Sequence, residues 1–430
     1  MNSGTTKEFK LSKGYRNYVF ILLCLLYLFD YMDRMVVTSL FPFMKQDWAL
    51  TDAECGMFVS AVYWSIIIFT FPVSILVDRW SRRKSIGIMA VVWSIATAVC
   101  ALTKNFTQLF MARSIIGVGE AGYAPGGTAM ISGLYPQEKR SQMMGIWNAF
   151  IPLGAALGIA LGGIIAKNFG WRYAFGLVAL PGLIIAIMFF FVKDYKTVDL
   201  TKTLTTDNAG TTRLKMKAMD IFKEFMATPS LIFTYFGFAC VTFVTVSLMT
   251  WLPTFFHRVQ GIPEDKAGVM AAGVMLLALV GSPLGGFLTD LWLKKNAKAR
   301  PLFATFTTII SAVLLFIAFT FLDGNARYAC ILVVGLTIIA FLPAAAAITQ
   351  DVVHPGLRAI SYAFCVIIQN LLGSSTGPIV IGSISDSYGI KTALSVLPVS
   401  LVIAAVLFFL ASFFYVKDVN KVEKVVLEME

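Results

Sequence analysis

The sequence predicts an all-α membrane protein whose twelve transmembrane helices form two pseudo-symmetric six-helix bundles. The chain has 430 residues, of which 58% are hydrophobic and only 14% are charged, with a mean hydropathy of +0.77. A soluble protein of this length carries about 25% charged residues. Apolar stretches of membrane-spanning length recur along the chain, and a glycine pattern in the first half returns in the second.

A transmembrane helix needs about 20 predominantly apolar residues. One such stretch alone would also fit a buried core helix, but twelve in series predict membrane embedding. The expected spans are 17–41, 56–77, 85–103, 107–134, 141–166, 173–192, 229–256, 267–289, 302–322, 328–350, 359–384 and 393–416.

The placement of positive charge predicts the topology. With a cytoplasmic N-terminus, 25 of the 35 Lys and Arg residues fall in inner loops and tails, eight in outer loops and two inside spans. This is the positive-inside distribution, so the net charge of +11 does not indicate nucleic-acid binding. We expect a multi-pass protein of a bacterial-type inner (plasma) membrane with both termini in the cytoplasm.

A polar stretch divides six spans from six. The expected organisation is an N-terminal bundle over 1–192, a cytoplasmic linker over 193–228, and a C-terminal bundle with a short cytoplasmic tail over 229–430. We expect a monomer that contacts the lipid bilayer and a small-molecule solute.

An internal repeat at an offset of 219 residues relates the two halves. Glycines spaced in this way let helices pack backbone to backbone in lipid. The matched positions are Gly154 and Gly373, Gly158 and Gly377, Gly163 and Gly382, Gly170 and Gly389, Arg172 and Lys391, and Ala174 and Ala393. The pattern predicts paired halves that rock against each other in alternating access, although tight helix packing alone would also explain it.

Several function classes are not expected. The six cysteines are scattered without a CxxC pair, so neither a metal site nor a disulfide framework is predicted. The chain has no phosphate-binding GxxxxGK[ST] loop and no soluble ATPase domain. It also shows no nucleophile–base constellation, so we expect no enzyme and no cofactor, with a proton gradient as the driving force.

Two loop motifs resemble those of a known family. The stretch Ser74-Ile-Leu-Val-Asp78-Arg79-Trp-Ser81-Arg82-Arg83-Lys84 follows the second span, and Gly286-Phe-Leu-Thr-Asp290 follows the eighth. They resemble the cytoplasmic-loop motif of the major facilitator superfamily, which implies the major facilitator fold. The resemblance also implies a conformational latch between the halves, formed by Asp78, Arg79, Arg82, Arg83 and Asp290. Serines stand at 74 and 81 where the family motif has glycines.

Within that superfamily, three stretches resemble the Spinster-like group: Tyr31-Met-Asp33-Arg34, Gly117-Val-Gly119-Glu120-Ala121 and Ile151-Pro152-Leu-Gly154. The Asp-Arg pair and the spacing of Arg113 and Glu120 also resemble, more weakly, the anion:cation symporters that carry sugar acids with protons.

Five ionisable residues lie well inside the predicted spans. Asp30, Asp33 and Arg34 are in the first span and Arg113 and Glu120 are in the fourth, whereas spans seven to twelve hold none. Charged groups in hydrocarbon cost about 2.5–3.5 kcal/mol each on insertion scales and usually mark a functional site. The ionic chemistry is therefore expected in the N-terminal half.

Helical geometry predicts how these charges meet. Asp30 and Arg34 are four residues apart and share a helix face, as do Arg113 and Glu120 after two turns. Asp33 lies roughly 24 Å from the inner edge and Arg113 about 9 Å below the outer edge of a ~30 Å core. We therefore expect the Asp33 carboxylate to face Arg113, with Glu120 deeper.

We expect Asp33 and Glu120 to carry the coupling proton and Arg34 and Arg113 to bind an anionic solute. The alternative is a static ion-pair network that holds the first and fourth spans together. Asp30 is either a structural partner of Arg34 or a functional acid.

Uncharged side chains are expected to add solute contacts. They are Tyr123, Asn148, Trp251, Gln369 and Asn370. Trp251, close to Pro253, could form part of a gate. A lone intramembrane Asn or Gln is as often an interhelical hydrogen-bond partner as a ligand.

These residues favour a secondary active transporter, with proton-coupled symport of a small organic anion such as a sugar acid or carboxylate. The Spinster likeness implies an alternative, the movement of an amphiphilic lipid such as a lysophospholipid. A non-transporting sensor on the same fold is a more distant alternative.

Overall fold

The computed structural model describes residues 12–79, 81–135, 137–192, 224–353 and 357–422. The first half contains α1 (Lys13–Val36), the 3-10 turn η1 (Val37–Ser39), α2 (Phe41–Trp48), α3 (Asp52–Arg79), α4 (Arg82–Cys100), α5 (Phe106–Glu120), α6 (Tyr123–Leu134), α7 (Gln137–Asn148), α8 (Phe150–Phe169) and α9 (Trp171–Phe189). The second half contains α11 (Pro229–Gln260), α12 (Glu264–Leu276), α13 (Ala278–Leu293), α14 (Ala299–Thr320), α15 (Gly324–Ala340), α16 (Leu342–Asp351), α17 (Arg358–Gln369), the π-helical turn η3 (Asn370–Ser374), α18 (Gly377–Tyr388), α19 (Ile390–Ser395) and α20 (Leu397–Lys421).

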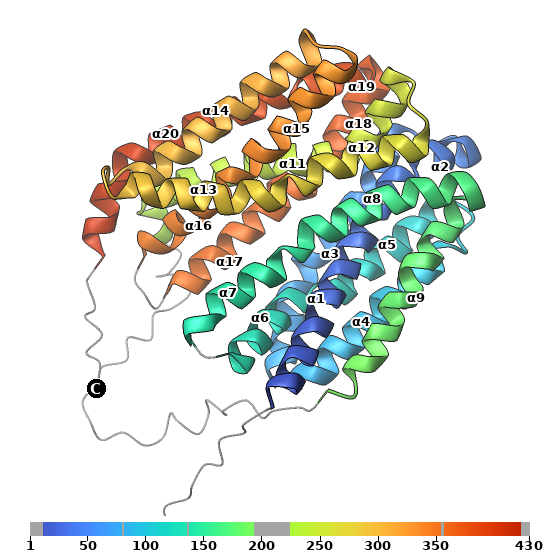
Figure 1. Cartoon of the computed structure of the whole chain (residues 1–430), viewed down its shortest axis with the longest axis horizontal. Helices are drawn as coiled ribbons and strands as arrows, with labels where there is room; N and C mark the ends of the chain where they lie inside the picture. The colour runs from blue at the N-terminus through green and yellow to red at the C-terminus, as the bar shows by residue number, and fades with distance from the viewer. Residues whose placement is uncertain (1–11, 80, 136, 193–223, 354–356, 423–430) are drawn as a thin grey trace, which may run out of the picture.

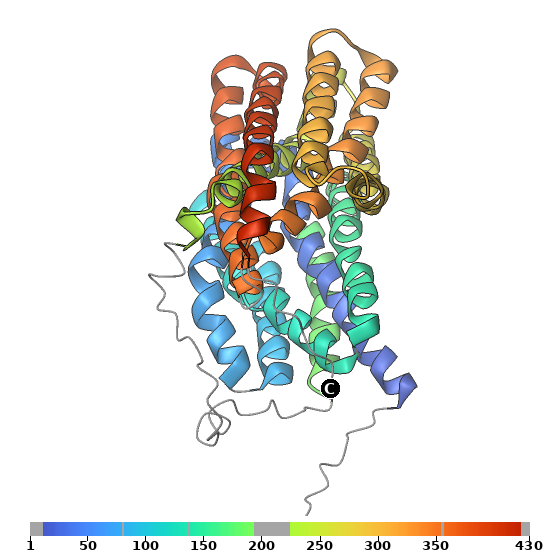
Figure 2. The same ribbon diagram turned by 90° about the vertical axis from the view of Figure 1, so that its left-hand side faces the viewer.

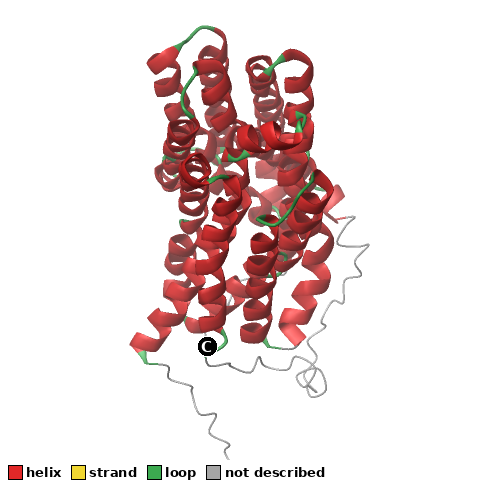
Figure 3. Cartoon of the chain, turned by 90° about the vertical axis from the view of Figure 1, so that its right-hand side faces the viewer, coloured by secondary structure: helices red, strands yellow, loops and turns green. Residues whose placement is uncertain are grey.

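The chain is helical throughout its described part, where Figure 3 shows helices joined by short loops and no strand. The helices follow the twelve predicted spans, but several spans are two helices in series. The second helix of such a pair begins with a proline in α16 (Pro343), α18 (Pro378) and α20 (Pro398). Proline lacks an amide hydrogen and clashes with the preceding turn, so it ends one helix and starts the next.

Ten stretches in the described residues are long and apolar enough to cross a membrane. The two remaining spans, α1 and the pair α5–α6, are the ones that carry the interior charges. Asp30, Asp33 and Arg34 lie in α1. Helix α5 has only 15 residues and ends at Glu120. Both spans depart from a simple apolar pattern because they hold the ionisable residues.

Large apolar side chains cover the outer faces of the helices. Ile68 is 66% exposed, Leu180 is 64% and Phe287 is 62%, and they belong to α3, α9 and α13. Soluble monomers rarely expose contiguous apolar surface on this scale. Lipid is the environment that suits these faces.

The two halves lie side by side. In Figure 1 the helices of the first half, blue to green, occupy the lower right, and those of the second half, yellow to red, the upper left. Figure 2, turned by 90°, shows the long helices of both halves running in broadly the same direction. Along the seam between the halves, α8 packs against α12 and α3 packs against α18.

The repeated glycines lie at equivalent points of this seam. A Cβ atom on Gly163 of α8 would lie 2.9 Å from the carbonyl oxygen of Glu264 in α12. A Cβ atom on Gly382 of α18 would lie 2.6 Å from the carbonyl oxygen of Asp52 in α3. Only glycine permits these approaches, so the sequence repeat corresponds to two related contacts between the halves.

Polar contacts between the halves gather at one end of the molecule. We call this the closed end; it comprises α2, the start of α3, the end of α8, the end of α11, the start of α12 and the end of α18. Arg258 and Asp386 of the second half bond Asp52 there, and Lys167 pairs with Asp265 at 2.6 Å. The aromatic rings of Phe41 and Trp251 meet with centroids 5.3 Å apart. This end of the seam is shut.

Candidate functional site

Arg34 lies between two carboxylates. Its Nη2 is 3.0 Å from Oδ2 of Asp30, one turn earlier in α1, as the spacing of four residues predicts. Its Nε is 2.8 Å from Oε2 of Glu120 at the end of α5. Both carboxylate side chains are fully buried, whereas the Arg34 side chain is 11% exposed. The guanidinium thus ties α1 to α5.

Two tyrosines complete the surroundings of Arg34. Its guanidinium carbon lies 4.7 Å from the ring centroid of Tyr31 in α1 and 5.8 Å from that of Tyr63 in α3. A cation over an aromatic face is stabilised by the ring quadrupole, more strongly where water is excluded. Neither tyrosine was among the expected site residues, because a tyrosine in an apolar span carries no distinctive sequence signal.

Arg113 makes different contacts from those the sequence predicts. All three guanidinium nitrogens donate to main-chain carbonyl oxygens: Nε to Phe58 at 3.1 Å, Nη1 to Asp33 at 2.7 Å and Nη2 to Arg34 at 3.0 Å. The side chain is fully buried. Arg113 lies beside Asp33 as the sequence suggests, but its side chain bonds the backbone of Asp33 and not its carboxylate.

The end of α1 explains this pairing. The last four carbonyls of an α-helix lack intrahelical partners, and α1 ends at Val36 where the chain tightens into η1. The carbonyls of Asp33 and Arg34 belong to that last turn. Arg113 bonds both of them and also one carbonyl of α3. Its side chain therefore joins α1, α3 and α5 at the turn of α1 that carries Asp33 and Arg34.

The expectation that Arg113 and Asp33 pair through their side chains is therefore wrong for this conformation. The Asp33 side chain is 1% exposed, and its Oδ1 has no hydrogen-bond partner among the described residues. Oε1 of Glu120 is likewise unbonded there. Two buried carboxylates thus keep an oxygen free to hold a proton.

The uncharged candidates of the first half fall into two environments. Tyr123 is 1% exposed, and its hydroxyl donates to the carbonyl of Leu23 at 2.5 Å. It packs within an aromatic cluster in which Tyr27 and Trp147 stack at 4.1 Å. Tyr123 therefore holds helices together in this conformation, whereas Asn148, at the end of α7, is exposed.

The second half places its candidates at an irregular point of its helix. Gln369 ends α17 and Asn370 begins the π-helical turn η3, and both are half-buried. Gln369 donates to Sγ of Cys365 at 3.2 Å, and Asn370 accepts from Ser374 at 3.1 Å. Single π-helical turns are frequent at functional sites, and η3 packs against α3 of the first half.

Trp251 lies in the closed end. It is fully buried, and its indole nitrogen donates to the carbonyl of Pro378 at 3.1 Å across α11 and α18. Its ring also meets Phe41 of the first half, and a role in a gate stays a prediction. In this conformation its ring faces protein, not a solute.

The expected latch lies mostly outside what the structure describes. The side chains of Asp78, Arg79 and Arg82 are not among the described ones. Arg83 donates to the carbonyl of Val192 at 2.7 Å, which is a contact within the first half. Asp290 is exposed on α13.

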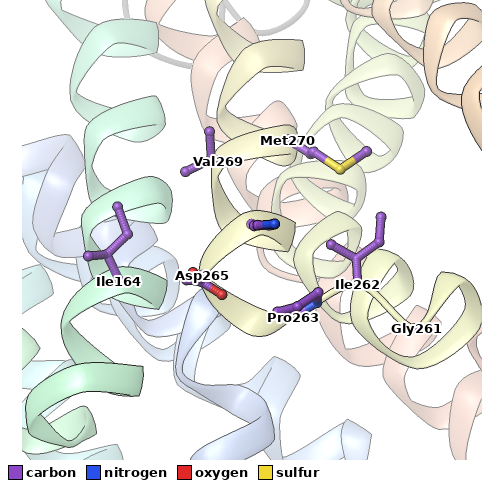
Figure 4. A pocket seen from close by; sticks show the side chains of 8 residues that line it. Ile164, Gly261, Ile262, Pro263, Asp265, Val269 and Met270 are labelled. Atoms are coloured by element: carbon purple, nitrogen blue, oxygen red, sulfur yellow. The ribbon is translucent and has the colours of Figure 1, made fainter.

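A separate hollow of about 580 Å³ opens between α8 and the turn that joins α11 to α12 (Figure 4). None of its lining residues belongs to the charged cluster around Arg34. They are Ile164, Gly261, Ile262, Pro263, Asp265, Lys266, Val269 and Met270. The hollow belongs to the closed end.

Sequence reasoning missed the ionic contacts of that end. The residues that make these contacts come from four separate segments: Asp52, Lys45, Arg258 and Asp386. One local signal was present, because Thr51 and Glu54 form the T-x-x-E pattern of a helix capping box. That pattern locates the start of α3 but gives no indication of its partners in the other half.

Comparison with known proteins agrees with the fold. A family model described as Major Facilitator Superfamily matches residues 23–378. The hexuronate transporter of Bacillus subtilis (strain 168) is 27% identical over 379 residues, which cover 86% of this chain and 88% of that protein. Protein spinster homolog 1 of Xenopus tropicalis is 30% identical over 404 residues, which cover 88% and 76%.

A solved structure has the same architecture. It is the crystal structure of a bacterial homolog to the human lysosomal transporter Spinster, in an inward-facing and unoccupied conformation. The TM-score is 0.84 at 23% sequence identity, covering 95% of this chain and 99% of that one. With its twelve spans, its paired halves and the family match over residues 23–378, the chain belongs to the Major Facilitator Superfamily of membrane transporters.

Proposed function

We propose that this transporter is a proton-coupled symporter of a small organic anion, such as a sugar acid or carboxylate, and that it works by alternating access. The observation that carries the proposal is the position of Arg34. Asp30 and Glu120 bind its guanidinium, and the Arg34 side chain is 11% exposed. It is a cation that an entering anion can reach, whereas Arg113 is fully buried.

The balance of charge supports a coupled proton. Asp30, Asp33 and Glu120 bring three carboxylates into a buried cluster with two guanidiniums, Arg34 and Arg113. If all five were ionised, one negative charge would be left without a partner. An uncompensated buried charge is strongly unfavourable. A proton bound to one of the three carboxylates removes this unpaired charge.

Competition for Arg34 gives the coupling its physical basis. A solute carboxylate that binds the guanidinium fork competes with Glu120 for the same nitrogens. Glu120, once displaced, is stable in this site only with a proton. Solute and proton therefore enter together and leave together, with Asp33 as a second proton site.

The remaining candidates have supporting roles. Asn148, Gln369 and Asn370 are half-buried or exposed polar groups that can bond solute oxygens. Trp251 gates the closed end, and Asp78 with its neighbouring arginines latches the opposite end. Arg113 supports the site through the backbone of α1.

The positive-inside distribution supports an orientation. We place both termini in the cytoplasm of a cell with a bacterial-type inner membrane, so that the closed end faces outward. The site then communicates with the cytoplasm in this conformation. We propose a monomer that requires no cofactor beyond the proton gradient.

Transport of an amphiphilic lipid is the second candidate. The 30% identity to protein spinster homolog 1 and the aromatic cluster of Tyr27, Tyr123 and Trp147 favour it. These rings are buried in the present conformation, so an apolar chain would reach them only after the helices around them part, while the anionic head binds Arg34. Both candidates therefore use the same cation.

A ligand panel and a flux assay separate the candidates. Sugar acids, simple carboxylates and lysophospholipids are tested by thermal stabilisation of the purified protein, and each ligand that binds is tested for uptake into liposomes. We expect stabilisation by an organic acid and uptake driven by an inward proton gradient. Stabilisation by lysolipids alone would favour the second candidate. Ligand binding without any flux would favour a sensor.

A further inference from the structure

The two halves share one buried carboxylate at the closed end. Asp52, at the start of α3, is only 2% exposed. Its oxygens receive two bonds from Arg258 of α11, at 2.7 and 2.8 Å, and one from Ser385 of α18, at 2.5 Å. Lys45 of α2 adds a fourth contact at 2.5 Å. Two of these partner residues belong to the second half and one to the first.

A second carboxylate crosses the seam in the opposite direction. Thr51 and Glu54 form a reciprocal capping box, with bonds of 2.8 and 3.1 Å between side chains and amides. The next amides of α3, those of Asp52 and Ala53, donate to Asp386 of α18 at 2.6 and 2.9 Å. The cap of α3 is thus completed by the other half of the protein.

Both contacts suit the groups that make them. A helix N-terminus presents unpaired amides and a partial positive charge, so a carboxylate is favourable there. The fork of Arg258 binds the Asp52 carboxylate through two parallel bonds, which is a strong and directional arrangement. The two carboxylates that make the contacts across the seam, Asp52 and Asp386, lie with two cations, Arg258 and Lys45, while the Glu54 carboxylate stays on the capping box of its own half.

Separation of the halves would not leave the buried carboxylate of Asp52 without a cation. Arg258, Ser385 and Asp386 would leave with the second half, and Lys45 would stay beside Asp52 in the first. Asp52 therefore keeps a cation in either arrangement, and water can replace Asp386 at the amides of α3. These contacts can break and reform without leaving a buried carboxylate unpaired.

We propose that Asp52 and Asp386 form a reversible lock that stabilises the closed end and sets the population of the conformation in which that end opens. The lock rests on the alternating access of the proposed function, but not on the identity of the solute. It would hold the unloaded protein in the present conformation until solute and proton offset the lost contacts.

A related contact across the seam should contribute less. Lys167 occupies the position that corresponds to Asp386 in the repeat, and it pairs with Asp265 at the start of α12. Its side chain is 42% exposed and that of Asp265 is 27% exposed. Exposed ion pairs contribute little because water and salt screen them. Lys167→Gln should therefore open the closed end less than Asp52→Asn.

The test measures the opening directly. Spin labels are placed at positions 168 and 387, both exposed at the closed end and in different halves, in a full-length chain whose six cysteines are replaced. Distances are recorded by double electron–electron resonance in nanodiscs, with neither solute nor proton gradient. We expect a single short distance in the parent. Asp52→Asn and Asp386→Asn should each add a longer distance and raise the ratio of open to closed protein several-fold.

Two further variants keep the result interpretable. Arg258→Gln leaves Lys45 on Asp52, so the first half keeps its own ion pair, and it should also populate the longer distance. Asp47→Asn is the matched control, because Asp47 lies at the same end but bonds Trp171 and Arg172 within the first half. It should leave the distribution unchanged. Parental distances in Asp52→Asn, Asp386→Asn and Arg258→Gln alike would overturn the lock, whatever solute the protein carries.

Discussion

Nε of Arg34 lies 2.8 Å from Oε2 of Glu120, an ion pair that joins α1 to α5 in the buried part of the first half. The same guanidinium holds Asp30 at 3.0 Å. A change in the protonation of Glu120 therefore alters the number of charges that compete for Arg34. The first prediction follows from this contact.

Glu120→Gln should uncouple solute from protons. Glutamine mimics the protonated acid but cannot release a proton, so accumulation driven by a pH gradient should vanish while solute exchange without a gradient persists. Uptake and counterflow in the same liposomes measure both. Accumulation against a gradient at the parental rate would show that Glu120 is not the coupling acid and would favour the static ion-pair network.

Arg113→Ala should destabilise the fold. It removes the donor to the carbonyls of Asp33 and Arg34 in the last turn of α1 and one added bond to α3, and each buried group left unsatisfied costs about 1–3 kcal/mol. The Tm of Arg113→Lys should lie between those of the alanine variant and the parent. An ammonium lacks the planar fork that reaches three carbonyls. Thermal unfolding in detergent gives the order of stability.

Solute affinity tells the two roles of Arg113 apart. A clamp on the backbone should lower Tm and affinity together. An alanine variant with the parental Tm and no solute binding would instead restore the direct contact that the sequence suggests.

Asp78→Asn should slow the transport cycle while leaving solute binding largely intact. Asp78 stands near the end of the 28-residue helix α3, in the motif that resembles a latch. It is therefore far from the charged cluster around Arg34 of α1. Binding is measured by thermal stabilisation and cycling by exchange across liposomes. Loss of binding with normal conformational exchange would contradict this role.

The topology prediction is tested by labelling. Single cysteines at positions 208 and 325 of a cysteine-free chain should react from opposite sides of the membrane with an impermeant maleimide. Position 208 should require access to the cytoplasm, since it lies in the basic linker. Equal labelling of both from outside would overturn the orientation.

Much of the architecture could be predicted from the sequence because the bilayer constrains it strongly. Twelve apolar stretches locate twelve spans, and the pair of Asp30 and Arg34 follows from their spacing of one helical turn. The break after Glu120 was not expected, because the stretch 107–134 is apolar on both sides of it. Hydropathy records the length of a span but not its bends.

The partners across helices were harder to predict. Spacing within α5 places Arg113 and Glu120 on one face, but it does not show how α5 is rotated against α1. That rotation brings Glu120 to Arg34 and turns Arg113 toward the backbone of α1. Asp52 and Arg258 are 206 residues apart, and their pairing depends on how two bundles dock.

The charges within the membrane are confined to one half, and this has a consequence for how such a protein can change. Spans seven to twelve contain no Asp, Glu, Lys, Arg or His residue, and their polar groups, such as Gln369 and Asn370, are neutral. On the proposed mechanism, substitutions there would change the contacts to the solute without altering Asp33 and Glu120, the acids proposed to carry the proton. If the proposed division of roles holds, solute choice can change through the second half while the proton-coupling residues of the first half stay the same.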